Sequence, residues 1–365
     1  MNKKLISFFL NDKKVQAKEN ESIWQVAKRF GEEIPHLCYS DEKSFRADGN
    51  CRACMVEIEG ERVLAASCIR QPIENMKVFT ASEKAKKSRK LVFELLLTDQ
   101  PKKEEAHDPN SQFWNWIEEV EVKDSRFPKK NACIPDVSHP SMAVNLDACI
   151  QCNLCVRACR EVQVNDVIGM AYRGENSKIV FDFDDPMGDS SCVGCGECVQ
   201  ACPTGALMPS SVVDEKGIGH TQVDKKIKSV CPYCGVGCQL EYNINDNKIS
   251  YVNGIDGPAN ENRLCVKGRF GFDYVSNPER LTKPLIRINN KEKDLHPSIN
   301  FSNIHEYFRE ASWDEALDYA AKGIIKLRKK DFKNKSSLAG FGSAKCSNEE
   351  AYLFQKLIRT GFKTN

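Results

Sequence analysis

The chain has 365 residues, of which 41% are hydrophobic and 28% charged, and its 53 basic side chains nearly balance its 51 acidic ones. A net charge of +2 excludes a protein that binds nucleic acid through overall positive charge, and the length suffices for about two to three domains. The longest apolar runs, such as residues 91–97, are short and contain a charge, so we expect no membrane span. The unusual number is 18 cysteines, too many to be scattered core residues.

The N-terminus predicts a β-strand and not a signal peptide. Its apolar stretch from Leu5 to Leu10 is short, runs directly into Asn11 and is followed by no small-residue cleavage site. We therefore expect a cytoplasmic protein, in which cysteines stay reduced and bind metals in preference to forming disulfides.

Residues 1–80 have the element order of a β-grasp ferredoxin. Two strand patterns, LISFFL and KKVQA, precede a short helix that begins after Ser22 and stops at Gly31. The expected inner face of this helix consists of Ile23, Val26, Ala27 and Phe30. Four cysteines then follow with the spacing C-x12-C-x2-C-x13-C, namely Cys38, Cys51, Cys54 and Cys68. The element order favours a [2Fe–2S] cluster, although the spacing taken alone also permits zinc.

Residues 81–140 are predicted to form a helical spacer with a Pro/Lys-rich end. Its helix runs from Ser82 to Leu97 and carries a basic run, which consists of Lys84, Lys86, Lys87, Arg89 and Lys90. We interpret this run as a solvated helix face, with a docking surface for a partner subunit as the alternative. Cys133, in the polar tail of the spacer, is interpreted as an idle linker thiol.

Residues 141–215 contain the most specific signal, the run C-x2-C-x2-C-x3-C, which occurs twice. In bacterial ferredoxins such runs bind two [4Fe–4S] clusters, and the fourth cysteine of each run serves the other cluster. We assign one cluster to Cys149, Cys152, Cys155 and Cys202. We assign the second cluster to Cys192, Cys195, Cys198 and Cys159. A pair of zinc sites is the alternative, which the duplicated run disfavours. The insertion between the runs predicts a hairpin about Arg173 to Asn176.

Residues 224–280 are predicted to form a small stranded domain with a fourth cysteine set, spaced C-x2-C-x3-C-x26-C. The members of this set are Cys231, Cys234, Cys238 and Cys265. In isolation the spacing fits a structural zinc site as well as a [4Fe–4S] cluster. The three neighbouring cluster motifs favour the cluster, because nearby cysteine sets would extend one electron relay.

Residues 281–365 are interpreted as an incomplete α/β domain. The segment SSLAGFG, residues 336–342, predicts a buried strand, and Ser347 with Glu350 predicts the capping box of a following helix. The whole sequence therefore predicts a modular α+β protein whose small units fold around their clusters.

The motif order resembles the N-terminal part of the alpha subunit of NAD-linked molybdenum or tungsten formate dehydrogenases. The likeness is specific in the two ferredoxin runs, in CPYCGVGC and RLCVKGRFG, and in RLTKPLIR and SWDEALDYAA. It implies one [2Fe–2S] and three [4Fe–4S] clusters, with a Mo/W-bis-MGD pterin cofactor in the complete enzyme. By this likeness Lys267 is the electron-relay lysine between the fourth cluster and the pterin; in another context it would be a solvated lysine.

The resemblance also implies partners, namely flavin- and NAD-binding iron–sulfur subunits and the remaining pterin-binding domains. Because the family's metal-binding cysteine or selenocysteine follows the matched segment, we expect the chain alone to be catalytically incomplete. Cys346 precedes that position, so we expect it to be a pterin-pocket or packing residue and not a metal ligand. The alternative is a non-catalytic, diaphorase-type electron-transfer subunit of an NAD-linked hydrogenase or complex I-like enzyme, which has no use for the pterin-like tail.

The sequence departs from its relatives at one cluster motif. The large iron–sulfur subunit of complex I carries an additional cluster on H-x3-C-x2-C-x5-C. Here the histidine is His107, but the three cysteine positions hold Ser111, Trp114 and Val120. We therefore expect no cluster there and expect His107 to lie in a turn or at the surface.

Overall fold

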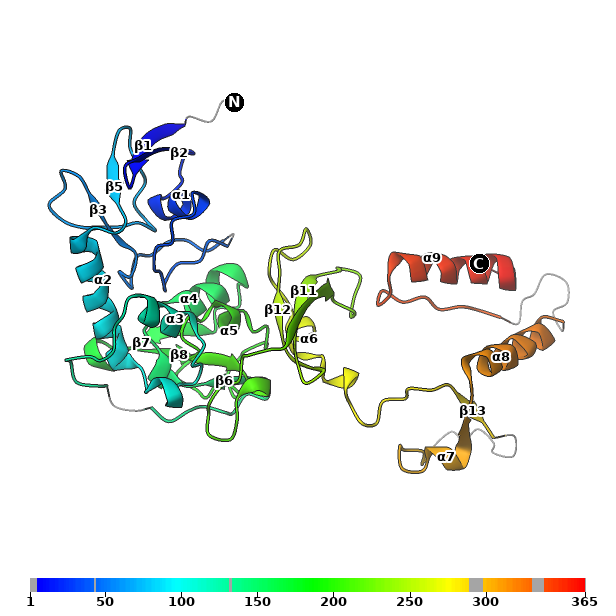
Figure 1. The fold of residues 1–365 in the computed structure, drawn as a ribbon. Coiled ribbons are helices and arrows are strands. Elements are labelled where there is room, and N and C mark those ends of the chain that lie inside the picture. Colours follow the sequence, from blue (N-terminus) through cyan, green and yellow to red (C-terminus); the bar gives the residue numbers. More distant parts are fainter. Residues whose placement is uncertain (1–4, 43, 131–132, 289–297, 330–337, 365) are drawn as a thin grey trace. The chain divides into compact units, whose positions relative to one another are not determined.

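The computed structural model describes residues 5–42, 44–130, 133–288, 298–329 and 338–364. The chain divides into two compact units, which are described separately. The first unit comprises Met1–Ser229 and Cys238–Phe270, and the second comprises Val230–Gly237 and Gly271–Asn365. Both contain helices and strands, which confirms the predicted modular α+β class (Figure 1).

The first unit begins with a five-stranded sheet in the order β2-β1-β5-β3-β4. The strands are β1 (Ile6–Leu10), β2 (Lys13–Ala17), β3 (Met55–Ile58), β4 (Ala65–Ala66) and β5 (Lys77–Phe79). Strands β1 and β5 run parallel, and the other described pairs are antiparallel, as in a β-grasp sheet. The predicted strand pair of the N-terminus is therefore confirmed.

Helix α1 (Ile23–Arg29) begins and ends where the sequence predicts. The Ser22 side chain accepts a hydrogen bond from the Gln25 amide, and the Gln25 side-chain oxygen accepts one from the Ser22 amide. Gly31, just after the helix, has φ +81°. The inner face is buried except at Phe30, which is 48% exposed. Phe30 is the C-cap residue and lies beyond the last full turn, so the expected burial of this side chain is wrong.

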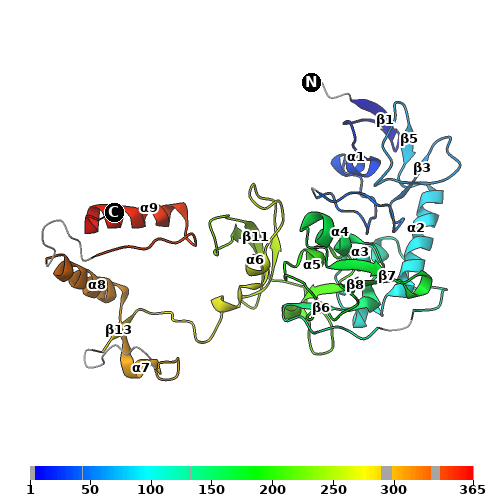
Figure 2. The same ribbon diagram turned by 180° about the vertical axis from the view of Figure 1, so that it is seen from behind.

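The spacer carries α2 (Glu83–Leu96) and α3 (Gln112–Glu119), with two 3₁₀ turns between them (Leu97–Asp99 and Lys103–Glu105). Figure 2, seen from behind, shows α2 running from the β-grasp sheet alongside the next module. The aromatic side chains Phe93, Phe113 and Trp114 are buried in a core shared with Leu37 and Leu154. The spacer therefore supplies the apolar core that joins the modules on either side of it.

One member of the basic run departs from the expected solvated face. Arg89 is 7% exposed and donates hydrogen bonds to the carbonyl oxygens of Met55 and Thr80. The helix turns Arg89 toward the sheet, where a guanidinium can satisfy several carbonyl oxygens at once, so the solvated interpretation is wrong for this residue. The other members, Lys84, Lys86, Lys87 and Lys90, are partly or fully exposed.

The ferredoxin-like module is built on short elements. These are β6 (Met142–Val144), α4 (Leu154–Arg157) with a π-turn after it (Ala158–Val162), β7 (Ile168–Ala171), β8 (Lys178–Phe181), α5 (Glu197–Ala201) and β9 (Leu207–Pro209). Strands β6 and β9 pair antiparallel, and 3₁₀ turns occur at Leu146–Ala148, Gly174–Asn176 and Ser210–Val212. Strands β7 and β8 form the predicted hairpin.

The last part of the first unit is a three-stranded sheet in the order β10-β11-β12. Its strands are β10 (Lys225–Val230), β11 (Gln239–Asn245) and β12 (Lys248–Gly254), and α6 (Val266–Phe270) follows. Asp246 and Asn247 both have positive φ, as a two-residue hairpin turn between β11 and β12 requires. The predicted stranded domain is therefore present.

The second unit contains β13 (Leu285–Arg287), α7 (Ile304–Tyr307), β14 (Phe308–Glu310), α8 (Trp313–Arg328), α9 (Asn348–Lys356) and a π-turn (Leu357–Phe362), and β13 pairs with β14. The capping box of Ser347 and Glu350 is confirmed at the start of α9. The predicted buried strand is wrong for residues 338–342, which have no strand structure, and Phe341 is 93% exposed. A strand forms only as part of a sheet, and none of the sheets assigned among the described residues includes this segment. Residues 336 and 337 lie outside the described residues.

No helix in the described parts of the chain is both long enough and apolar enough to cross a bilayer.

Candidate iron–sulfur sites

The first cysteine set lies in buried loops around the β-grasp core. Cys38, Cys54 and Cys68 are at most 2% exposed, and the Cys51 amide donates to the Cys38 Sγ at 3.4 Å. The hydrogen bond from the Cys51 side chain lowers the pKa of Cys38 to about 6, against the effect of burial. In the same way, the hydrogen bond from Cys68 lowers the pKa of Cys54 to about 7. The four thiols are thus close enough to exchange hydrogen bonds and to affect one another's charge.

The ferredoxin cysteines lie together in two groups that cross the two runs. Burial raises the pKa of the Cys155 thiol far above its usual range, and the charges of Cys152, Cys149, Cys202 and, with the smallest effect, Cys198 raise it further. Around Cys198, burial acts first on the pKa, followed by the charges of its neighbours, which are Cys195, Cys192 and Cys159. The fourth cysteine of each run therefore lies near the cysteines of the other run, while the assignment of the thiols to two clusters stays a prediction.

Backbone conformation in these loops directs amide groups toward sulfur. Gly194 donates its N–H to the Cys192 Sγ at 3.4 Å, and Val167 donates to the Cys159 Sγ at 3.3 Å. Gly194 and Gly196 have positive φ, and in the first run Gln151 and Asn153 adopt the same left-handed conformation. Successive N–H groups in such turns form a concave surface that stabilises anionic sulfur.

Within the described residues, no three Cys, His, Asp or Glu side chains converge tightly enough to hold one metal ion. The fit to iron–sulfur clusters is therefore judged from the donor groups themselves. The three sets of the first two modules offer only thiols, held in buried loops with amide groups directed at sulfur. Cysteine thiolates are the ligands of both [2Fe–2S] and [4Fe–4S] clusters, so the residues present fit these groups.

The fourth cysteine set is divided between the two compact units. Cys231 and Cys234 belong to the second unit, while Cys238 and Cys265 belong to the first. Their joint cluster site remains a prediction. Lys267 is exposed on α6, two residues after Cys265.

Cys346 lies in the second unit and is partly buried. Its thiol donates to the Ser343 carbonyl oxygen at 2.9 Å and lines an apolar hollow of about 640 Å³, together with Phe341 and Phe354. This position is compatible with either of its predicted roles, as a pocket or a packing residue.

An arginine that the sequence analysis did not single out joins α6 to the second ferredoxin loop. Arg269 donates to the Cys195 carbonyl oxygen at 2.8 Å and to the Gln200 side chain at 2.7 Å, and forms an ion pair with Glu197 at 3.1 Å. Both members of the ion pair are 2% exposed at their side chains. Burial raises the pKa of Glu197 and lowers that of Arg269, and each charge opposes the shift of the other.

Gly196 provides the space that Arg269 occupies. A Cβ atom at this glycine would overlap the Cδ of Arg269, and φ is +71°. At Gly194, a Cβ would instead press against Val266. The absence of a side chain at these two glycines thus lets α6 pack directly against the loop, and their positive φ angles shape the turn. The only sequence signal for Arg269 is its place four residues after Cys265, which shows nothing of its tertiary partners.

His107 lies in a bend of the chain, as one part of that expectation has it, but the side chain is buried, so the expected surface position is wrong. Its side chain is 2% exposed, and its Nδ1 lies 2.6 Å from the carbonyl oxygen of Gly205, three residues after Cys202. Burial lowers the pKa of His107, which favours a neutral ring that donates from Nδ1. Gly205 has φ +76° and lacks the Cβ that would overlap Asp108, so the spacer can approach this loop closely.

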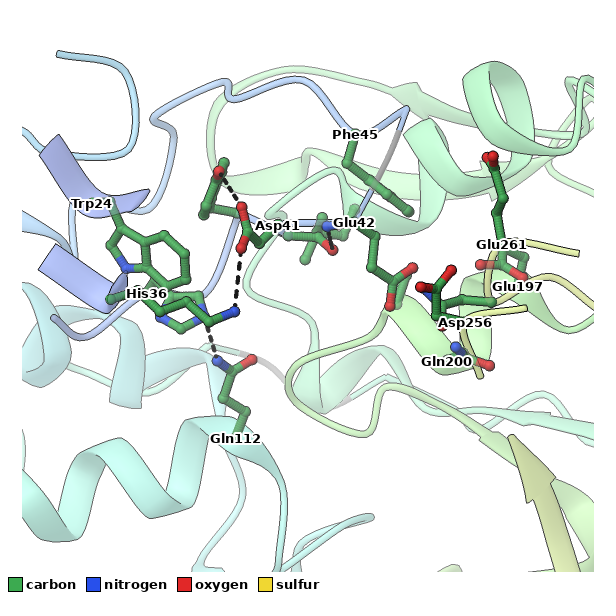
Figure 3. A pocket seen from close by; sticks show the side chains of 16 residues that line it. Trp24, His36, Asp41, Glu42, Phe45, Gln112, Glu197, Gln200, Asp256 and Glu261 are labelled. Atoms are coloured by element: carbon green, nitrogen blue, oxygen red, sulfur yellow. Dashed lines mark hydrogen bonds and ion pairs between the residues drawn. The ribbon is translucent and has the colours of Figure 1, made fainter. Parts of the chain in front are cut away.

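An acidic hollow of about 540 Å³ also lies in the first unit (Figure 3). Its labelled carboxylates are Asp41, Glu42, Glu197, Asp256 and Glu261, and Trp24, His36 and Gln112 line it near Asp41. The Gln112 amide lies 3.1 Å from the Nε2 of His36. Burial raises the pKa of Glu42, and the charge of Glu197 raises it further.

Comparison with known protein families gives four matches in chain order. The first two are a 2Fe-2S iron-sulfur cluster binding domain at residues 3–83 and a 4Fe-4S dicluster domain at residues 148–206. A molybdopterin oxidoreductase Fe4S4 domain follows at residues 224–277, and a molybdopterin oxidoreductase domain at residues 280–365. Together these matches cover all four cysteine sets and the segment after them.

Curated relatives cover nearly the whole chain. A Bacillus subtilis protein provisionally named as the oxidoreductase YjgC is 31% identical over 98% of this chain and 38% of its own length. A Staphylococcus haemolyticus protein provisionally named as a formate dehydrogenase is 30% identical over 91% of this chain and 36% of its own length. The chain thus spans little more than a third of these relatives.

A solved structure has a similar fold. A chain from the crystal structure of an NAD+-reducing [NiFe]-hydrogenase matches with a TM-score of 0.52 and 23% identity, over 60% of this chain and 90% of that chain. This likeness shows the fold alone. The four family matches, together with the curated relatives, confirm the predicted resemblance. The chain combines a 2Fe-2S domain, a 4Fe-4S dicluster domain, a molybdopterin oxidoreductase Fe4S4 domain and a segment of a molybdopterin oxidoreductase domain.

Proposed function

We propose that the chain is the iron–sulfur electron-transfer portion of a formate dehydrogenase alpha subunit. It carries electrons from a Mo/W-bis-MGD site toward a flavin- and NAD-binding partner in the cytoplasm. The order of the four domain matches and the names of the staphylococcal relatives support this assignment. The observation that carries it is the Arg269 junction, because this side chain ties the helix that follows Cys265 to the loop that contains Cys195.

The chain's own residues hold the relay in place. Formate oxidation to carbon dioxide releases one proton and two electrons, and iron–sulfur clusters carry electrons one at a time. The thiolates of the four sets would hold one [2Fe–2S] and three [4Fe–4S] clusters, which would carry the electrons, and the loop N–H groups directed at sulfur would tune their potentials. Lys267 would serve as the relay residue toward the pterin, and Cys346 would contribute to the pterin pocket.

Iron analysis tests the number of clusters. The chain, purified and reconstituted without oxygen, should contain about 14 iron atoms and show the visible absorption of iron–sulfur clusters. About 18 iron atoms would instead reveal a further cluster near His107. Stoichiometric zinc with little iron would contradict the electron-transfer function altogether.

A second candidate is the diaphorase-type subunit of a hydrogenase, and the likeness to the hydrogenase chain favours it at the level of fold alone. Purifying the native complex through a tag on this chain separates the two candidates. The formate dehydrogenase assignment predicts molybdenum or tungsten, a pterin guanine dinucleotide, a flavin and formate-dependent reduction of NAD. Nickel together with hydrogen-dependent reduction of NAD would support the second candidate instead.

A further inference from the structure

A buried arginine lies between the first two cysteine sets. Arg157 ends α4 and is 2% exposed. Its Nη2 donates to the carbonyl oxygen of Cys38 at 2.7 Å and to that of Cys152 at 3.4 Å. These two cysteines belong to different sets, so one guanidinium contacts the backbone of both.

Further contacts fix this guanidinium to the loop before Cys51. Its Nη1 donates to the carbonyl oxygen of Arg46, and its Nε lies 3.2 Å from the Asp48 carboxylate. The Arg46 side chain in turn pairs with Asp48 at 3.3 Å and with Glu161, in the π-turn after α4, at 3.2 Å. The loop that leads to Cys51 is therefore linked by several charged contacts to the segment that carries Arg157.

We propose that Arg157 is a positioning residue that fixes the [2Fe–2S] site against the first [4Fe–4S] site and favours reduction of the [2Fe–2S] cluster. The proposal rests on the iron–sulfur function proposed above. A positive charge acts strongly in a buried region of low dielectric, and a reduced cluster carries one more negative charge than an oxidised one. The spacer residue Trp114 is buried in the same apolar core as Cys38 and Cys152, so the backbone that Arg157 contacts is packed on this side as well.

Two substitutions in the full chain separate the charge of Arg157 from its geometry. Arg157→Gln removes the charge, whereas Arg157→Lys keeps the charge but loses the planar fork that reaches two carbonyl oxygens. Arg160→Gln is the matched control, because Arg160 lies three residues further along, is 53% exposed at its side chain and pairs with Asp166. Iron content is measured first, and the [2Fe–2S] signal is then followed by electron paramagnetic resonance during a redox titration.

For Arg157→Gln, we expect the ratio of reduced to oxidised [2Fe–2S] cluster at a fixed potential to fall about tenfold, or about 59 mV for one electron. Arg157→Lys should stay within about threefold of the wild type, and its fully reduced sample should show a weaker magnetic interaction between the two neighbouring clusters. Arg160→Gln should match the wild type in both measurements.

The outcomes distinguish this inference from the function on which it rests. A wild-type chain without iron would contradict the proposed function itself. A chain with full iron in which Arg157→Gln leaves the potential unchanged would overturn the role of Arg157. If Arg157→Gln loses the [2Fe–2S] cluster, the test rests on Arg157→Lys. An unchanged magnetic interaction between the two neighbouring clusters in Arg157→Lys would overturn the positioning role, whereas a weakened interaction would support it.

Discussion

The ferredoxin-like module and the segment after residue 280 use the same local signals but differ in burial. All four residues of α4 are buried, whereas the 16 residues of α8 include no buried side chain. Both α8 and α9 begin at a serine whose side chain accepts a backbone N–H, as does α1 in the β-grasp domain. Helix ends are therefore set by neighbouring residues, while burial depends on partners far away in the sequence.

The apolar side chains of α8 sharpen this contrast. Leu317 and Ile325 are each more than half exposed, although they lie eight residues apart, a spacing that puts both on one helical face and predicts that this face is covered. In the first unit, similar side chains pack around the cysteine loops and the spacer. The cysteine loops thus form part of the apolar core that stabilises each module.

The largest expected effect comes from comparing two ion pairs. Replacing Arg269 by Met leaves the Glu197 carboxylate buried without its partner, which should cost about 3–5 kcal/mol of unfolding free energy. The matched change in the second unit is Arg309→Met, which removes the partner of Glu315 from an ion pair about half exposed at both side chains. That change should produce no measurable loss, because water solvates the remaining charge. Chemical denaturation, followed by cluster absorbance and by circular dichroism, measures both.

The double variant Arg269→Met/Glu197→Leu is the internal control for the buried pair. It removes both charges, so most of the lost stability should return. If the double variant is as unstable as Arg269→Met, the loss comes from packing around the Arg269 stem and not from the unpaired Glu197 charge.

A smaller effect is expected from two glycines that share a left-handed backbone but differ in surroundings. At Gly196, alanine meets both backbone strain and the Cδ of Arg269, so we expect a loss of about 2–4 kcal/mol. At Gly174, φ is +58° but nothing lies within 4 Å of the added Cβ, so only the strain of about 1–2 kcal/mol remains. Equal losses in denaturant unfolding would show that α6 does not need the space at Gly196.

The two capping boxes provide a milder comparison. Ser22→Ala and Ser347→Ala each remove a hydroxyl that accepts an N–H at a helix start, which costs about 0.5–2 kcal/mol. Because α1 packs into a buried core, the loss at Ser22 should lower the unfolding midpoint of the whole β-grasp domain. The loss at Ser347 should appear as faster local proteolysis at α9. A global destabilisation by Ser347→Ala would contradict the local character of that helix.

Motifs that close within a few residues were predicted well from the sequence. The strand pair at the N-terminus, the caps at Ser22 and Ser347, and the hairpin after Arg173 follow from turn and capping chemistry. Cys202 also lies close enough to Cys149 for its charge to raise the pKa of that thiol, although the division of the ferredoxin thiols between two clusters stays a prediction. In each case the partners lie within one motif or its repeat.

The features that the sequence did not predict depend on partners from separate elements. Arg89, Arg157 and Arg269 are all buried by contacts with carbonyl groups from distant segments, and nothing in their local sequence distinguishes them from surface arginines. His107 is buried because Gly205, about a hundred residues away, leaves room for the spacer. The predicted buried strand is wrong at residues 338–342 for a related reason, since apolar composition cannot supply a neighbouring strand.

The smallest expected effect concerns pH and the acidic hollow beside the Arg269 junction. Burial and the charge of Glu197 raise the pKa of Glu42 above its ordinary value of 4.5, while Arg269 and Arg263 oppose that shift. The folded state therefore holds this proton more tightly than the unfolded chain, and the stability that protonated Glu42 contributes is lost as the pH rises through the folded pKa. Glu42→Gln has no proton to lose, so the free energy of unfolding of the variant should rise relative to the wild type from about pH 5 upward and then level off.

Denaturant midpoints across this pH range measure the difference in stability between Glu42→Gln and the wild type. This difference should shrink in a Glu197→Gln background, because one source of repulsion is gone. A difference that grows as the pH falls would mean that an attractive partner for Glu42 outweighs its burial and Glu197.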